Sequence, residues 1–214
     1  MRVMRQCVLA LVIAGFYTAP VRAEDSAQDV LDKVKKKYVS IHDAQIHFSQ
    51  RVKFEMAKIE QQAEGTLLLK KENKYRVELG EQTIVTNGET VWSYSVPNNQ
   101  VLIDHFKIDD RMFSPERILT AAPDDFSATL IGSEKTGKGE AVVLKLMPKD
   151  DQAFVTSMKL WVDNATWLIR KVEFVDINGK ETEYTVNEMK VNIGLQDSRF
   201  TYQIPEGVEV VDLR

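Results

Sequence analysis

Short runs of alternating hydrophobic and polar residues, each stopped by a turn signal, fill most of this chain. The pattern is clearest between residues 65 and 106. There, residues 75–79 alternate apolar and charged side chains, the period of a strand with one solvated face. Asn87-Gly88 and Pro97-Asn98-Asn99 predict tight connections, the first of them a type I′ hairpin turn. The result is an antiparallel meander whose aromatic face must cover either a core or a ligand.

Two helical patterns interrupt the strands. Ser26 and Asp29 have the spacing of a capping box, and apolar residues at helical spacing follow, so we expect an N-terminal helix. Ser114-Pro115 predicts an N-cap with proline at the first position of a short mid-chain helix. Strands resume afterwards, with a last one expected over 200–204. Overall, the pattern predicts about nine to eleven strands in a sheet that curls, because twisted antiparallel sheets of this width seldom stay flat.

Residues 1–23 have the features of a cleavable secretory signal. Two arginines form a basic start, a short apolar run follows, and Val21-Arg22-Ala23 has the small residues that a signal peptidase requires, so cleavage is expected after Ala23. The apolar run is too short to span a bilayer. The single cysteine, Cys7, lies in this segment, so neither a disulfide nor a lipid anchor is expected in the exported chain. We expect residues 24–214 to form one domain.

Charge and motif content narrow the range of functions. Residues 1–23 contain three arginines and no acid, so their removal changes the net charge from −4 to −7. No basic cluster with interleaved aromatics is present, so we expect no nucleic-acid binding. His42, His47 and His105 are scattered, whereas a metal site needs several converging ligands, so no metal is expected. No nucleophile elbow or phosphate-binding glycine loop occurs. We therefore expect a protein that is not an enzyme.

The region of the mid-chain helix has an unusual concentration of apolar side chains beside charged ones. Met112, Phe113, Ile118 and Leu119 form the apolar group. Two interpretations are open. The helix either covers the end of the sheet as ordinary core packing, or it is a lid over an apolar cavity that opens for a ligand. Composition alone favours ordinary packing.

An ordered set of short motifs covers nearly the whole exported chain. The motifs are F-x-Q (Phe48–Gln50), G-T-L-L-L-K-K (Gly65–Lys71), I-V-T-N-G-E-T-V-W-S-Y (Ile84–Tyr94), S-P-x-x-I-L (Ser114–Leu119), V-E-F-x-D-x-N-G (Val172–Gly179) and F-T-Y-x-I-P-x-G-V-x-V (Phe200–Val210). In this order they resemble the periplasmic outer-membrane lipoprotein carrier family, the LolA-like proteins. The resemblance implies a mainly β fold, an unclosed antiparallel β-barrel capped by short helices. It also implies an apolar cavity between them, no cofactor and no catalysed reaction.

The resemblance also implies partners. Carriers of this family take lipidated outer-membrane lipoproteins from an ABC transporter in the inner membrane, shield their acyl chains, and pass them to an acceptor lipoprotein at the outer membrane. Such shielding is needed because each methylene exposed to water costs about 0.8 kcal/mol. We therefore expect a monomeric periplasmic lipoprotein chaperone. The alternative is a lipid-sensing regulatory module of the same fold, although such proteins usually carry a further domain. A periplasmic hydrolase is a third hypothesis.

The inward-facing residues of the family map onto this chain position by position. The family's lid corresponds to Ser114–Leu119, with Met112, Phe113, Ile118 and Leu119 as the apolar residues of the lid region. Many members have an arginine that hydrogen-bonds the lid backbone where this chain has Lys71-Glu72. Lysine lacks the planar guanidinium, so a weaker lid clamp is expected. The predicted wall of the lipid cavity consists of Phe48, Leu67, Leu69, Tyr75, Val77, Leu79, Trp92 and Tyr94.

Overall fold

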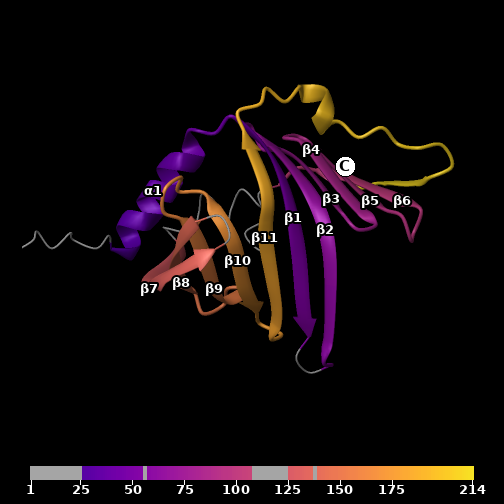
Figure 1. Ribbon diagram of the computed structural model, residues 1–214. Helices are drawn as coiled ribbons and strands as arrows, with labels where there is room; N and C mark the ends of the chain where they lie inside the picture. Colours follow the sequence, from indigo (N-terminus) through magenta and orange to yellow (C-terminus); the bar gives the residue numbers. More distant parts are fainter. Residues whose placement is uncertain (1–25, 55–56, 108–124, 137–138) are drawn as a thin grey trace, which may run out of the picture.

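The computed structural model describes residues 26–54, 57–107, 125–136 and 139–214 (Figure 1). In this part of the chain, twelve strands form one sheet, accompanied by an α-helix and a 3₁₀ helix. The predicted signal segment and mid-chain helix lie outside the described residues. The elements are α1 (Ala27–Val39), β1 (Asp43–Phe54), β2 (Ile59–Lys70), β3 (Lys74–Leu79), β4 (Gln82–Asn87), β5 (Thr90–Ser95), β6 (Gln100–His105), β7 (Phe126–Thr136), β8 (Gly139–Pro148), β9 (Val155–Asp163), β10 (Ile169–Asp176), β11 (Lys180–Val191), η1 (Asp197–Phe200) and β12 (Glu209–Asp212).

The strand order is β12-β6-β5-β4-β3-β2-β1-β11-β10-β9-β8-β7. All pairs are antiparallel except β12, which runs parallel to β6. Strands β7 and β12 are the two edges, so the sheet does not close into a barrel. The predicted fold class, a mainly β, unclosed and antiparallel sheet preceded by a helix, is confirmed. The structure has one strand more than the expected nine to eleven.

Helix α1 begins where the sequence predicts. The Ser26 hydroxyl accepts the backbone N–H of Asp29 at 3.1 Å, and the Asp29 carboxylate accepts the backbone N–H of Ser26 at 2.9 Å. This complete capping box satisfies two amides that the first turn leaves without helical partners. Lys36 and Lys37 occupy the last turn, where positive charge complements the helix dipole.

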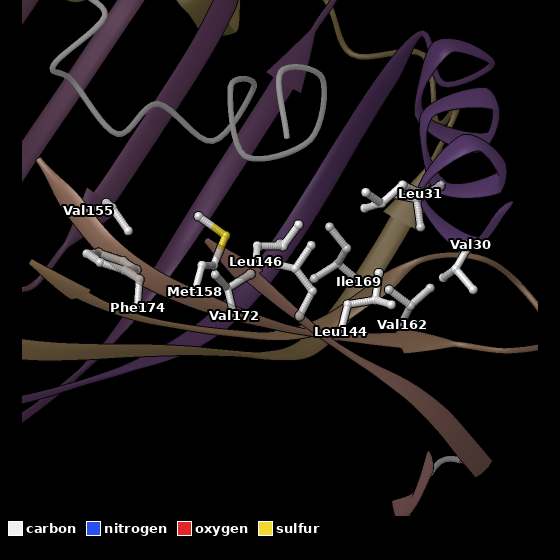
Figure 2. Close-up of a cluster of buried hydrophobic side chains, with 12 residues drawn as sticks. Val30, Leu31, Leu144, Leu146, Val155, Met158, Val162, Ile169, Val172 and Phe174 are labelled. Carbon is white, nitrogen blue, oxygen red and sulfur yellow. The ribbon is translucent and has the colours of Figure 1, made fainter. Parts of the chain in front are cut away.

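One side of α1 is buried against the sheet. Val30, Leu31 and Val34 join an apolar cluster formed by strands β8, β9 and β10. Figure 2 shows Val30 and Leu31 of the helix pointing toward Val162 and Ile169 of the sheet. The face of the sheet that α1 covers is called the inner face below, and the opposite one the outer face.

The three central strands, β2, β1 and β11, are long, and their neighbours pair with opposite ends of them. Strand β3 pairs only with Gly65–Lys70, the C-terminal half of β2. Strand β10 pairs only with Glu181–Thr185, the N-terminal half of β11. The two flanking groups of strands are therefore staggered along the central ones, and the sheet is tilted and curled instead of flat (Figure 1).

Two local expectations are wrong. The last strand is not at 200–204, because Phe200 ends η1 and is fully buried, and the final strand begins only at Glu209. The β4–β5 hairpin is not a type I′ turn, since Gly88 has a positive φ of 94° but Asn87 does not. Instead, the Asn87 side-chain oxygen accepts the backbone N–H groups of Glu89 at 3.0 Å and Thr90 at 2.8 Å, which stabilises the turn.

Candidate functional site

The register of the strands decides which side chains share the inner face, because directly paired residues of neighbouring antiparallel strands point to the same side. Phe48 pairs with Gly65, which pairs with Leu79. The next pairs along β2 and β3 follow the same alternation. Six of the eight predicted wall residues therefore share one face: Phe48, Leu67, Leu69, Tyr75, Val77 and Leu79.

This is the same face that α1 covers at the other end of the sheet. Tyr184 of β11 pairs with Val172 of β10, a member of the cluster under the helix. Tyr184 also packs against the cluster that contains Phe48 and Tyr75. The inner face therefore carries an apolar surface that runs without interruption from β8 to β4, where Ile84 packs against the same cluster.

Trp92 and Tyr94 are not part of this face, which corrects the predicted cavity wall. Trp92 pairs with Val85, whereas Tyr75 pairs with Thr86. Val85 and Thr86 are neighbours on β4, so they point to opposite sides of the sheet. Because the Trp-x-Tyr spacing keeps both rings on one side, Trp92 and Tyr94 lie together on the outer face.

Aromatic pairs link the two halves of the inner face. The rings of Phe48 and Tyr184 meet edge to face with centroids 5.7 Å apart, and Tyr184 stacks on Phe174 at 6.3 Å. Tyr75 and Phe106 form another edge-to-face pair at 6.5 Å. Such pairs add about 0.5–1.5 kcal/mol each beyond simple burial. Sequence reasoning missed Tyr184, Phe174 and Phe106. The alternation in sequence shows that Tyr184 and Phe174 each lie on the apolar side of a strand. Only the register of the strands shows that this side belongs to the inner face.

Tyr184 is the polar member of this aromatic group. Burial raises the pKa of its hydroxyl, an effect that a hydrogen bond from Gln50 partly offsets. The Gln50 side-chain amide donates this bond to the Tyr184 oxygen at 2.8 Å. The phenol is therefore neutral and hydrogen-bonded, and it places no charge on the inner face.

The Phe48 ring occupies space that is available only because Gly65 has no side chain. A Cβ atom at Gly65 would lie 2.5 Å from Cζ of Phe48 and 2.8 Å from the backbone oxygen of Glu78. The ring therefore packs directly on the β2 backbone, in the space that any other residue would fill. Phe48 is consequently a rigid part of the inner face.

A buried carboxylate anchors the segment that follows β11. Asp43 at the start of β1 accepts the backbone N–H groups of Ile193 at 2.8 Å and Gly194 at 3.1 Å. Its own backbone oxygen accepts the N–H of Asn192 at 2.7 Å. Asp43 is only 6% exposed, so its buried carboxylate depends on these amides for its hydrogen bonds. The C-terminal segment therefore leaves β11 in a defined direction.

The C-terminal segment then covers the outer face of β3 and β4. Asp197 forms ion pairs with Lys70 and Lys74, and the resulting hydrogen bonds lower the pKa of the Asp197 carboxyl. Beyond η1, Tyr202 packs on Tyr94 with ring centroids 5.9 Å apart. On the outer face, Tyr94 thus packs against the protein's own C-terminal segment.

Lys71 lies in the β2–β3 turn and is exposed. Its backbone N–H donates to the carbonyl of His42 at 3.0 Å. Three residues, Lys71, Glu72 and Asn73, connect the paired Lys70 and Lys74, and the positive φ of Glu72 (69°) and Asn73 (59°) makes this turn tight. The predicted lid residues Met112, Phe113, Ile118 and Leu119 lie outside the described residues. The clamp between Lys71 and a lid therefore stays a prediction.

The described residues offer no cluster of three or more His, Cys, Asp or Glu side chains that could hold a metal ion. Of the three histidines, His47 is occupied by its neighbours on the outer face. Its Nε2 lies 3.0 Å from the Gln45 amide nitrogen and its Nδ1 lies 3.1 Å from the Thr66 hydroxyl. Across the described ranges, no helix combines the length and apolarity needed to cross a membrane.

A curled, unclosed sheet with a continuous apolar inner face defines a half-barrel. The family of the outer membrane lipoprotein carrier protein LolA matches residues 40–203, which is more than half of the sequence, and the chain belongs to this family. This confirms the resemblance seen in the ordered motifs.

Individual relatives are distant. An outer-membrane lipoprotein carrier protein of Pseudomonas aeruginosa is 28% identical over 155 residues, 71% of this chain and 72% of that protein. One of Hahella chejuensis is 25% identical over 206 residues, 94% of this chain and 95% of that protein. An uncharacterised protein of Methanocaldococcus jannaschii is 25% identical over 206 residues, but the match spans only 58% of its length.

The fold also occurs in a solved structure. The crystal structure of an uncharacterised conserved protein from Thermus thermophilus aligns with a TM-score of 0.59 and 20% identity, over 87% of this chain and 98% of the other. This likeness supports the architecture and carries no information on activity.

Proposed function

We propose that this protein is a periplasmic carrier that holds the acyl chains of lipoproteins on its inner face. The observation that carries the proposal is the row of aromatic contacts from Phe174 through Tyr184 to Phe48, which joins the two halves of the sheet into one apolar surface. Membership in a family of lipoprotein carriers supports the same conclusion. The protein acts as a binding protein, not as an enzyme, and needs no cofactor.

The physics of transfer suits this surface. Each methylene moved from water to the inner face gains about 0.8 kcal/mol, so a broad apolar face suffices for shielding without specific contacts. Release must remain easy, which favours a loose fit. In the proposed cycle, residues 1–23 act as the signal that directs export of the monomeric carrier. It then receives lipidated lipoproteins from an inner-membrane ABC transporter and passes them to an outer-membrane acceptor lipoprotein.

The carrier function is tested by release from spheroplasts. Purified protein covering residues 24–214 is incubated with spheroplasts that contain the transporter, and the soluble fraction is examined for lipoprotein in complex with the carrier. We expect a soluble complex that depends on the added protein. If no lipoprotein is released although the transporter is intact, the carrier proposal is wrong.

The ligand surface is tested separately by displacement of an apolar dye. An acylated peptide should displace the dye, and its unacylated form should not, because only the acyl chain competes for the apolar face. Trp92 is unsuitable as the reporter, since it lies on the outer face. Equal displacement by both peptides would show that the inner face is ordinary core.

A further inference from the structure

The N-terminal half of β2 extends past the end of its neighbour β3 in the middle of the sheet. Strand β3 pairs with Gly65–Lys70 only, and within the described ranges no strand pairs with Ile59–Glu64 on the side away from β1. The cause is Gly80, whose φ of 56° ends β3 after Leu79 and turns the chain into β4. Figure 1 shows β1 and β2 continuing well past the end of β3.

The outer side of this edge is acidic. Glu60 and Glu64 are exposed and point to the outer face, and no residue in the described part of the chain forms an ion pair with Glu64. A pocket of about 290 Å³ lies where β3 ends, and Glu64, Gly80 and Glu78 are among the residues that line it. Glu78 is paired with Arg76 at 2.6 Å, so Glu64 is the carboxylate on the wall of this pocket that has no ion pair among the described residues.

Two cations of β1 lie behind these acids on the outer face. Arg51 is held by an ion pair with Glu183 at 3.0 Å, a carboxylate that Lys171 also contacts at 3.6 Å. Lys53 is directly opposite Glu60 in the register and offsets part of its charge. Glu64 has Ser49 as its cross-strand partner, so the end of the edge near β3 stays negative.

The inner side of the same edge is apolar at its tip. Ile59 pairs with Phe54 across the β1–β2 hairpin, and the two residues are 51% and 37% exposed. Gln61 and Ala63 follow on the same side. A strand added to this edge would thus meet carboxylates with one set of alternating side chains and apolar surface with the other.

We propose that this edge binds an extended segment of a partner protein whose side chains alternate between basic and apolar. The bound segment would lie beside β2, where β3 would continue if it were longer, and would run antiparallel to β2. The backbone of Ile59–Glu64, which no described strand pairs on the side away from β1, supplies the hydrogen bonds of strand addition. The alternating faces supply the specificity. A second copy of this chain is disfavoured as the occupant, because two such edges would bring their glutamates together. The inference does not depend on the acyl-chain ligand.

The test uses labelled hexapeptides and residues 24–214 of the protein. A peptide of alternating lysine and valine should bind, as measured by fluorescence anisotropy, and should slow hydrogen exchange at the amides of 59–64. The same peptide with alternate backbone nitrogens methylated should not bind, because it lacks the donors for strand addition. A peptide of alternating glutamate and valine should also fail to bind.

Two double variants that replace acids by lysine, one at the edge and one away from it, test the role of charge. Glu60→Lys with Glu64→Lys should weaken the lysine peptide about tenfold or more, because two exposed attractions become repulsions. It should also allow the glutamate peptide to bind. Asp151→Lys with Glu206→Lys makes the same change in net charge at exposed turns away from the edge and should leave binding unchanged.

Four results would overturn the proposal. They are equal binding of the two charged peptides, equal binding of the methylated peptide, protection confined to residues outside 59–64, and equal weakening by the Asp151 and Glu206 control. Protection of 59–64 that rises with protein concentration in the absence of peptide would show that a second copy of the chain occupies the edge, and would also overturn it.

Discussion

Tyr75 and Trp92 lie on opposite faces of the same sheet, although they belong to one continuous meander. Their partners on β4, Thr86 and Val85, are adjacent and therefore point to opposite sides. On β5, the inner-face positions that pair with β4 include serine residues, so the apolar surface ends at β4. A ligand on the inner face would contact β1–β4 together with β10 and β11.

The assignment of the acyl ligand to the inner face can be tested on β4, where two adjacent residues of similar exposure point to opposite sides of the sheet. Ile84 pairs with Val77 on the inner face, whereas Thr83 pairs with Tyr94 on the outer face. Ile84→Lys should weaken binding of an acylated peptide about tenfold or more, because a charge would be desolvated beside the acyl chain. Thr83→Lys should leave binding nearly unchanged.

Binding is measured by dye displacement, with the thermal unfolding midpoint of each variant as the check that it is folded. Equal weakening by both substitutions would contradict the assignment of the ligand to the inner face.

Gly65→Ala should destabilise the protein, because the added methyl group would overlap the Phe48 ring and the Glu78 carbonyl. We expect a loss of about 1–3 kcal/mol in the free energy of unfolding, the usual cost of overpacking. Urea denaturation measures this loss. Phe48→Leu combined with Gly65→Ala should cost less than the sum of the two single substitutions, since removal of the ring relieves part of the overlap. Strict additivity would show that the ring is not what restricts this position.

The two acids that anchor the C-terminal segment should differ in importance because they differ in burial. Asp43→Ala removes a buried carboxylate that accepts the amides of Ile193 and Gly194 and should cost about 2–4 kcal/mol. Asp197→Ala removes ion pairs from a side chain that is 63% exposed and should cost clearly less. Urea denaturation of both variants decides the comparison, and equal losses would contradict the assignment of the main anchor to Asp43.

Asp163 should make stability depend on pH in the acid range. Burial alone would raise its pKa, but hydrogen bonds from Arg170 and Thr166 outweigh that effect and lower the pKa to about 2. A carboxyl with a lowered folded-state pKa stabilises the fold fully above its unfolded value of about 4, and this contribution disappears as the pH falls toward 2.

Over that interval, the wild type should lose on the order of 2 kcal/mol more unfolding free energy than Asp163→Asn, which has no charge to titrate. Urea denaturation in steps between about pH 5 and pH 2 measures the difference. Parallel pH profiles of the two proteins would show that the ion pair between Asp163 and Arg170, 2.8 Å long, does not contribute to stability in this way.

Lys71→Arg tests the predicted lid clamp. Arginine presents a planar set of donors that can hold backbone carbonyls, whereas lysine offers a single point charge. If lid closure limits exchange, the substitution should slow uptake or release of an acylated ligand in stopped-flow dye displacement. Lys71→Gln, which removes the charge, serves as the control and should not slow it. Unchanged kinetics in Lys71→Arg would count against a clamp at this position.

Local structure was predictable because its causes are local. The capping box of Ser26 and Asp29 marks the start of α1, and the alternation of residues 75–79 marks β3. The segment after β11 was mispredicted as a strand, because Phe200 and Tyr202 look like strand residues in sequence. Their actual contacts are with the outer face, through η1 and Tyr94.

The sequence by itself determined the fold class and the N-terminal helix, and period-two alternation correctly grouped the residues of each strand by side. It could not relate the sides of different strands. Trp92 and Tyr94 were assigned to the cavity wall from their aromatic character and the resemblance to the family, and the register through β4 places them on the outer face. Only the tertiary structure brought Phe174, Tyr184 and Phe48 together, since their contacts depend on pairing between β10, β11 and β1. Those pairings join segments far apart in the chain, and no local pattern specifies them.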